Sequence, residues 1–428
     1  MRIIHTKLFR GHIFKIHNGA TPKSSESDYW NGDINWITPE DLGHNIGKTI
    51  RDSRRKITLE GYNNCGVSIA SSGSIALSTR APIGHLAKVE LPSCVNQGCR
   101  LLEPQEGCED YWYYTLHSAN STLVSRGQGT TFMELPRQSL KSIKSSVPPP
   151  EEQQTIAAFL DYKTAKIDAL IAKKKALLDK LAEKRTALIS HAVTKGLDPK
   201  VPMRDSGIDW LGDIPAHWEA LPLRRLVINV KTGSTPTGVN ETHFDDKGMP
   251  WFKPGDFDNS LFLDNAEKRL SEEGVNEVRV FPPNTVMHIG IGATIGKVGI
   301  TTLEASCNQQ INSIICNEKL NPLYAVYYLH SIKEFIVKCG KYTTLPIINQ
   351  DETKELIFTV PPVEEQEMIT QSLLHEEEHI NTQQNRINAV INKLLEYRSA
   401  LITNAVTGKI DVRNFRLPEA EELVTHEE

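Results

Sequence analysis

One segment of this chain carries the glycines and the lysine of a nucleotide-binding loop, but their spacing is wrong. In Gly290-Ile-Gly-Ala-Thr-Ile-Gly-Lys-Val298, a phosphate-binding loop would need glycine at Ile291 and serine or threonine at Val298. A dinucleotide-binding loop would need a third glycine at Ile295. We therefore interpret the segment as a tight turn between strands.

The other residues capable of chemistry do not form a recognisable active site either. Cys94, Cys99 and Cys108 lack the spacing of zinc-binding pairs and have no histidine pair nearby. The sequence contains no His-Glu-x-x-His motif and no nucleophile elbow, and Phe281-Pro-Pro-Asn284 has the wrong order for an amino-methyltransferase motif. We expect no catalytic residue, no metal and no bound cofactor in this chain.

Residues that can hydrogen-bond base edges and phosphates are instead frequent in the predicted loops. Arginine and lysine pair with guanine in the major groove, asparagine and glutamine with adenine, and serine and threonine with either. The basic loop 48–56 is suited to phosphates, or it is only a solvated surface loop. The DNA-binding candidates are Lys23, Arg54, Arg55, Arg80, Arg100, Arg126, Gln128 and Thr130 in the first half, and Thr237, Lys253, Lys297, Lys341, Tyr342 and Thr343 in the second.

Asn96-Gln97 and Asn308-Gln309 are the same in both halves, so we interpret them as scaffold residues. Residues that read different sequences should differ between the halves. Arg126 and Gln128 against Lys341 and Tyr342 satisfy that condition.

Composition is that of a soluble globular chain of two to four domains. The net charge of −5 does not exclude nucleic acid, because a basic face can coexist with acidic segments such as the tail 409–428, which we expect to be disordered. No apolar run reaches membrane-spanning length, no signal peptide begins the chain, and seven scattered cysteines fit a reducing cytoplasm.

The chain repeats itself once. Val147-Pro-Pro-Pro-Glu-Glu-Gln153 returns as Val360-Pro-Pro-Val-Glu-Glu-Gln366, and Arg185–Thr194 returns as Arg398–Thr407, both displaced by 213 residues. Weaker matches link Gly19–Pro22 with Gly233–Pro236 and Trp36–Asp41 with Trp251–Asp256. Order is kept while the intervening sequence varies, as in a shared scaffold with two different surfaces.

Residues 1–150 and 221–360 read as two mixed α/β globular domains. Short β-branched runs such as 66–70 and 74–78 are separated by turn residues. Asp110–Leu116 and Pro322–Leu329 are predicted to be equivalent short helices with aromatic core faces.

The segments 151–196 and 361–408 each predict one long helix. Prolines precede both, Gly196 and Gly408 end them, and apolar residues recur at spacings of 3, 4 and 7. About 42 residues would make a rod of roughly 60 Å. The apolar stripe that we expect to pack against a helix or a partner includes Ile156, Leu160, Ile167, Leu181 and Leu188, and Ile369, Leu373, Ile380, Leu394 and Leu401.

The economical way to bury both stripes is an antiparallel pair of the two helices, that is, a coiled coil. Charge favours this pairing, since Lys173–Lys175 and Arg185 belong to the first helix and Glu376–Glu378 to the second. Packing on partner subunits is the competing possibility. In the linker 197–220, Trp210, Leu211, Ile214 and Trp218 are expected to fasten the chain onto the second domain.

With these features the chain resembles the specificity subunits of type I restriction-modification systems over essentially its full length. The resemblance rests on the two Pro-Pro-x-Glu-Glu-Gln helix starts, the linker motif Asp205–Trp218, and Ala405-Val-Thr-Gly-Lys-Ile-Asp411. It implies two target recognition domains, 1–150 and 221–360, that read a split, asymmetric double-stranded DNA target, and spacer helices that set the gap. It further implies two methyltransferase subunits, which use S-adenosylmethionine, and restriction subunits, which use ATP and magnesium.

Three alternatives remain open from sequence. The chain could be a specificity subunit of a modification-only system, a coiled-coil assembly scaffold that does not read DNA, or an enzyme with an unrecognised site. The scaffold predicts no sequence-selective DNA binding, and the enzyme predicts S-adenosylmethionine binding or nuclease activity by the isolated chain, whereas the sequence does not separate the modification-only system.

Overall fold

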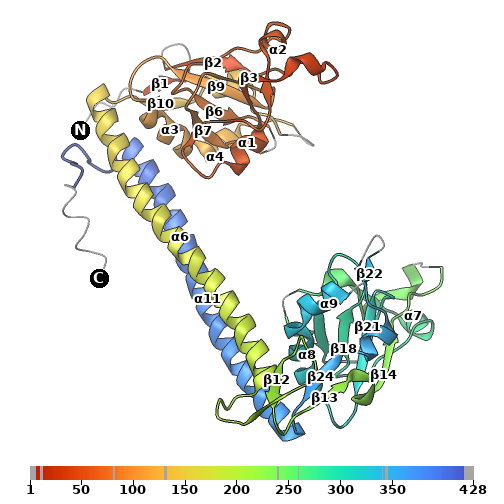
Figure 1. Cartoon of the computed structure of the whole chain (residues 1–428). Coiled ribbons are helices and arrows are strands. Elements are labelled where there is room, and N and C mark those ends of the chain that lie inside the picture. The colour runs from red at the N-terminus through yellow and green to blue at the C-terminus, as the bar shows by residue number, and fades with distance from the viewer. Residues whose placement is uncertain are drawn as a thin grey trace. The chain divides into compact units, whose positions relative to one another are not determined.

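The computed structural model describes residues 6–9, 13–80, 82–129, 133–238, 241–258, 260–339, 341–342 and 346–418. It divides into two compact units, residues 1–174 with 388–428 and residues 175–387. Unit 1 contains a globular domain at 6–146, called head 1 here, and unit 2 contains head 2 at 219–360; each unit also holds parts of two long helices (Figure 1). Of the tail 409–428 expected to be disordered, residues from 419 onward lie outside the described residues, whereas Val412 is buried and Phe415 packs edge-on against Phe159, with ring centroids 5.2 Å apart. Nowhere in the described ranges is a helix both long and apolar enough to cross a membrane.

Head 1 is built on a five-stranded sheet and a three-stranded sheet. The larger sheet has the order β2-β9-β6-β7-β4, in which only β4 and β7 run parallel. The smaller has the order β5-β3-β8. The bounds are β1 Thr6–Leu8, β2 Phe14–Asn18, β3 Trp30–Ile37, β4 Thr49–Ile50, β5 Lys56–Ile57, β6 Ile75–Ser78, β7 Leu86–Val89, β8 Ser93–Val95, β9 Cys99–Pro104 and β10 Lys144–Ser146. The run 66–70, predicted to be strand-like, forms no strand; only Ala70 makes an isolated bridge, to Ser93.

Head 2 repeats the two sheets of head 1 strand for strand and adds the pair β22-β23. Its larger sheet has the order β14-β21-β18-β19-β16, again with one parallel pair, β16 and β19, and its smaller sheet the order β17-β15-β20. The bounds are β13 Glu219–Pro222, β14 Val227–Thr232, β15 Phe244–Phe252, β16 Phe262–Leu263, β17 Lys268–Leu270, β18 Val286–Ile289, β19 Val298–Thr301, β20 Ser306–Cys307, β21 Ile311–Cys316, β22 Lys341–Tyr342, β23 Pro346–Ile347 and β24 Ile357–Val360. β13 pairs with β24 as β1 pairs with β10.

Short helices complete both heads. The two predicted aromatic helices are present, as α3 and α8, and their tyrosines are buried in the cores. The bounds in unit 1 are η1 Ser27–Tyr29, α1 Pro39–His44, α2 Leu59–Asn63, α3 Glu109–Ser118, α4 Asn120–Ser125 and α5 Arg137–Lys141. Those in unit 2 are η2 Leu223–Arg225, η3 Glu241–His243, η4 Pro254–Asp256, α7 Glu272–Asn276, α8 Pro322–Ser331, α9 Lys333–Cys339 and α10 Gln350–Lys354.

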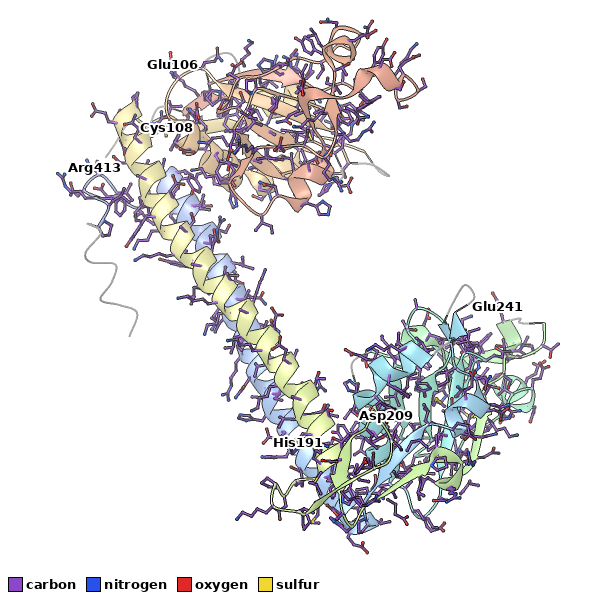
Figure 2. The ribbon with its side chains drawn as sticks, in the orientation of Figure 1. Glu106, Cys108, His191, Asp209, Glu241 and Arg413 are labelled. Atoms are coloured by element: carbon purple, nitrogen blue, oxygen red, sulfur yellow. The ribbon has the colours of Figure 1, made fainter. Side chains whose placement is uncertain are left out.

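The repeated Pro-Pro-x-Glu-Glu-Gln motif fastens the start of each long helix to its head. In α6 (Pro150–Lys195), Gln153 accepts a hydrogen bond from the backbone of Cys108, the residue before α3, at 2.9 Å and donates to Pro148 O at 2.9 Å. Cys108 is labelled in Figure 2, near the beginning of α6. In α11 (Val363–Val406), Gln366 accepts from the backbone of Asn321, before α8, at 2.8 Å. Both glutamine side chains are buried, so each hydrogen bond replaces one lost to water.

A tyrosine of each head holds the end of the other long helix. The hydroxyl of Tyr111 in α3 is shared between Ser146 O, at 3.0 Å, and Val406 O of α11, at 3.4 Å, and Tyr324 of α8 donates to Val193 O of α6 at 3.0 Å. The carbonyls of Val406 and Val193 belong to the last turn of a helix, where the backbone has no partner within the helix. In unit 1 the first turns of α6 therefore lie beside the last turns of α11 (Figure 1), and unit 2 has the reverse arrangement.

The antiparallel pairing of α6 and α11 predicted from the apolar stripes is thus confirmed within each unit. Eight of the ten predicted stripe residues are buried, whereas Leu188 and Leu394 are half-buried. The predicted charge pairing is also present: Arg185 of α6 binds Glu377 of α11 at 2.6 Å. In unit 1, Arg398 of α11 binds Asp168 of α6 at 2.9 Å.

The linker is fastened to head 2 as expected, beginning with the hairpin β11 (Met203–Asp205) and β12 (Asp213–Pro215). Leu211, Ile214 and Trp218 join the main core of unit 2. Trp210 stacks on Phe335, with ring centroids 4.4 Å apart, and stays 38% exposed.

Of the three acids 376–378, Glu377 is the one that fixes the helix pair. Its side chain is 7% exposed and also accepts a hydrogen bond from Tyr327 at 2.9 Å. We expect Glu377→Ala to destabilise unit 2 by about 3 kcal/mol, because it strands Arg185 and a buried phenol. The matched control is Glu378→Ala, an exposed position where the change should stay within about 0.5 kcal/mol. Equal melting temperatures of the two variants would contradict this assignment.

A buried histidine makes head 2 sensitive to acid. His288 in β18 is fully buried, and neither ring nitrogen has a partner in the described part of the chain. Burial lowers its pKa to about 4. The unfolded chain therefore binds a proton at higher pH than the fold does.

The stabilisation that depends on neutral His288 is present above pH 6.5 and is lost as pH falls toward 4, by roughly 3 kcal/mol in total. We expect a His288→Leu variant to show a flatter dependence of melting temperature on pH across this window. An unchanged slope would mean that His288 is not kept neutral by burial.

Candidate nucleic-acid interface

A pair of aromatic side chains lies at the equivalent place on the three-stranded sheet of each head. Trp36 of β3 donates from Nε1 to Ala20 O at 2.9 Å, and Trp251 of β15 donates to Ser234 O at 3.0 Å. Trp30 packs edge-on against Trp36, with centroids 5.1 Å apart, and Phe244 takes that place beside Trp251 at 6.1 Å. The indole hydrogen bonds tie a loop, 19–22 or 233–236, to the sheet.

A glycine allows each loop to come close to the Asn-Gln turn. A Cβ at Gly19 would lie 1.7 Å from Asn96 O, and one at Gly233 would lie 2.0 Å from Cys307 O. The loop threonine then reaches the turn: Thr21 donates to Gln97 Oε1, and Thr235 to Gln309 Oε1 at 2.7 Å. The Asn-Gln pairs therefore hold scaffold loops together, as their recurrence indicates.

An aspartate at the equivalent position of each head connects two further segments. Asp41 Oδ2 accepts from the backbone of Thr38 at 2.8 Å, and Oδ1 accepts from the backbone of Arg54 at 3.1 Å. Asp256 accepts in the same way from Lys253 at 2.7 Å and from Glu267 at 2.9 Å. We call the set of equivalent tryptophan, glycine, threonine–glutamine and aspartate contacts the frame.

The side chains mounted on the frame differ in charge. In head 1, Arg54 forms an ion pair with Glu40. In head 2, the position equivalent to Arg54 is Glu267, which forms an ion pair with Lys253 at 2.8 Å. The same two segments are thus bridged with opposite polarity. The hydrogen bond from Arg54 lowers the pKa of Glu40, and the one from Lys253 lowers the pKa of Glu267, so both acids stay ionised.

Stacked cations lie on the aromatic pair. The guanidinium carbon of Arg55 is 3.7 Å from the centroid of the Trp30 ring. Lys268 Nζ is 4.5 Å from the centroid of the Phe244 ring. In head 1, Arg55 borders an open hollow of about 880 Å³, whose lining also includes Trp36, Glu40, His44, Arg54 and His85.

The other candidates of head 1 fall into two groups. Arg80 and Arg100 converge on Glu134, at 2.8 and 3.9 Å, and burial lowers the pKa of Arg100. Arg126 donates to Ser139 O at 3.2 Å and to Ser142 Oγ, and so supports the scaffold. Lys23 and Gln128 are exposed, as is Arg80 despite its ion pair, and Thr130 lies outside the described residues.

In head 2, the candidate Lys297 donates to Phe257 O at 2.6 Å and also supports the scaffold. Thr237 is exposed and donates through its backbone to Glu277 at 2.7 Å. Lys341 and Tyr342 form β22, but their side chains, like Thr343 as a whole, lie outside the described residues. The structure brings Arg54, Arg55 and Lys253 onto the frame; whether any candidate touches DNA stays a prediction.

Sequence reasoning missed Lys268 and the aromatic partners Trp30 and Phe244. The signal was present: Lys268 lies 213 residues after Arg55, the same displacement that relates the helix motifs. Applying the repeat to individual charged residues would have found this pair.

The chain thus holds two copies of one head, each built on the same frame contacts but carrying different charged side chains. This is the architecture of a protein that recognises two different sites. A family model described as the type I restriction modification DNA specificity domain matches residues 9–180 and 218–393. The chain therefore belongs to this family, as the repeated motifs had indicated.

Individual relatives agree. The chain is 28% identical to the type I restriction enzyme MjaIX specificity subunit of Methanocaldococcus jannaschii, over 94% of this chain and 92% of that one. It is 26% identical to the EcoR124I/EcoR124II specificity subunit of Escherichia coli over 48% of this chain and 46% of that one.

Among solved structures, a chain from a study of type I R-M complex assembly and conformational transition matches with a TM-score of 0.71, at 15% identity, over 95% of this chain and 98% of that one. The HsdS subunit of Thermoanaerobacter tengcongensis matches with a TM-score of 0.51, at 16% identity, over 95% of this chain and 97% of that one. These likenesses confirm the predicted mixed α/β fold.

The frame can be tested through its glycines. Gly233→Ala should destabilise head 2 by about 1–3 kcal/mol, because its Cβ meets backbone that cannot move aside. Gly255→Ala is the control, since a Cβ there meets nothing within 4 Å and its effect should be neutral or slightly stabilising. Thermal unfolding measures both. If Gly233→Ala melts like the wild type, the close loop approach is not a constraint.

Proposed function

We propose that this chain reads a bipartite, asymmetric DNA target, with each head reading one half-site in the major groove. The observation that carries the proposal is the charge reversal between two equivalent segments of the frame: Arg54 pairs with Glu40 in head 1, whereas at the position of Arg54 head 2 has Glu267, which pairs with Lys253, the equivalent of Thr38. Base edges are read by the donors and acceptors that a surface presents, so two surfaces of opposite pattern on one frame suit two different half-sites.

The long helices supply the spacing and the docking surface in this proposal. Their repeated sequence offers one site twice, which suits two identical methyltransferase subunits. Exposed apolar side chains on the helices support a partner there: Leu170, Leu177, Met368, Val390, Leu395 and Tyr397. Leu177 and Val390 are equivalent in the repeat and are 42% and 40% exposed.

The chemistry in this proposal belongs to the partners, in the cytoplasm. Methyltransferase subunits would methylate adenine with S-adenosylmethionine, and restriction subunits would use ATP and magnesium. This chain would then be a non-catalytic recognition subunit that binds none of these cofactors.

The test is to map methylated adenines in a host that expresses this chain together with type I methyltransferase subunits from the same source, and in the same host without this chain. We expect one asymmetric motif of two half-sites and a fixed gap, present only with the chain. Methylation without a bipartite motif would contradict the proposal, and sequence-independent DNA binding would favour a scaffold.

The spacing role predicts a specific change. Seven residues inserted after Lys174 and seven after Ile387, equivalent positions in the two helices, would lengthen the pair by about 10 Å at 1.5 Å per residue. We expect the gap to grow by about three base pairs at 3.4 Å each, with both half-sites unchanged. Insertion into α6 alone is the control and should abolish methylation by breaking the helix pairing. An unaltered gap in the double insertion would refute the spacing role.

A further inference from the structure

The stacked cations of the two heads occupy one structural position. Arg55 precedes β5, whose Ile57 pairs with Trp30 of β3. Lys268 begins β17, whose Leu270 pairs with Phe244 of β15. Each cation therefore lies over the aromatic residue that pairs with the strand beside it. The cation is a guanidinium in head 1 and an ammonium group in head 2.

The Trp30 ring, on which Arg55 stacks, is held in a fixed position. Trp30 is 8% exposed and donates from Nε1 to Lys23 O at 3.2 Å, while Trp36 packs on it from the side and lies 5.5 Å from the same guanidinium. A guanidinium stacked on an indole uses its flat face and keeps its N–H donors in the plane. The ordering of this long side chain is thereby completed before any ligand arrives, which reduces the entropy lost on binding.

The donors of Arg55 remain available within the described part of the chain, where no side chain or carbonyl accepts from its guanidinium. Its neighbour Arg54, in contrast, is engaged by Glu40. The hollow beside Arg55 is lined by Glu40 and Asp41 as well as by Arg54. Glu40 is already paired with Arg54, and Asp41 accepts from backbone N–H groups, but both carboxylates still repel a phosphate, so this hollow suits the edge of a base pair better than the DNA backbone.

We propose that Arg55 reads a guanine of the half-site bound by head 1, donating two hydrogen bonds to O6 and N7. Lys268 makes the corresponding contact in head 2, where a single ammonium group selects less sharply than the guanidinium fork. This inference rests on the proposed function and adds to it the base and the residue that selects it.

The experiment uses the complete methyltransferase complex and the target found by mapping. Methylation rates are measured for wild type, Arg55→Gln and Arg55→Lys on duplexes in which each base pair of both half-sites is replaced in turn. A further set replaces each guanine by 7-deazaguanine, which has C–H in place of the N7 acceptor.

We expect wild type to lose about 10- to 100-fold in rate when one particular guanine is replaced, and to be slowed by 7-deazaguanine at that position. Arg55→Gln should lose this discrimination at that position alone and should no longer respond to 7-deazaguanine there. Arg55→Lys should retain a weakened response. Lys268→Gln should change discrimination only in the other half-site.

The control is Arg51→Gln, which removes an exposed charge from the same loop and should leave the base preferences unchanged. If Arg55→Gln instead lowers the rate on all duplexes alike and reduces the salt dependence of binding by about one charge, Arg55 contacts a phosphate and the inference is wrong. If the wild type shows a bipartite motif that every Arg55 variant shares unchanged, the inference again fails while the proposed function stands. A wild type with no bipartite motif would remove the proposed function itself.

Discussion

Each head holds the beginning of one long helix and the end of the other, and the rest of the structure depends on this double attachment. In head 1 the beginning is held by the hydrogen bond between Cys108 and Gln153, and the end by the one between Tyr111 and Val406. A helix leaves its first N–H groups and last C=O groups without partners in the helix, and burial of those ends is costly unless something else satisfies them. The heads provide those partners. Each head has one attachment for a helix beginning and one for a helix end. In a parallel pair each head would meet two beginnings or two ends, so the tyrosine contact with a helix end would be lost at one end of the pair.

In the pair of long helices, the two arginines that form ion pairs occupy equivalent positions of the repeat, but their acidic partners do not. Arg185 and Arg398 are equivalent in the repeat, whereas their partners Glu377 and Asp168 are not: the residue equivalent to Glu377 is Thr164, one turn before Asp168. Tyr327 contacts Glu377, and its equivalent Tyr114 contacts Thr164 at 3.1 Å and Asp161 at 2.7 Å. The backbone therefore repeats while the polar contacts distinguish α6 from α11.

Sequence alone was sufficient for the helices and the duplicated heads, because both leave local signals. A stripe such as Ile156 and Leu160 reports its own burial, and the proline-rich motif marks a helix start. The candidate interface depended on contacts between distant strands, which no local pattern encodes. Arg126 and Lys297 look like free cations in the sequence, yet each donates to a backbone carbonyl. Lys268 looks unremarkable, yet the pairing of β17 with β15 places it on Phe244.

The division between frame and surface has an energetic basis. The tryptophan and glycine contacts of the frame are buried or close-packed: Trp36 and Trp251 are 4% and 6% exposed, and Gly19 and Gly233 lie against backbone. Changes there cost stability through overpacking or unpaired polar groups. The ion pairs mounted on the frame are different, since Glu40 and Glu267 have side chains 64% and 74% exposed. Exposed ion pairs contribute little to folding, so they can be reversed or replaced while the head stays folded. A surface with that freedom can change what it recognises without altering the scaffold that positions it.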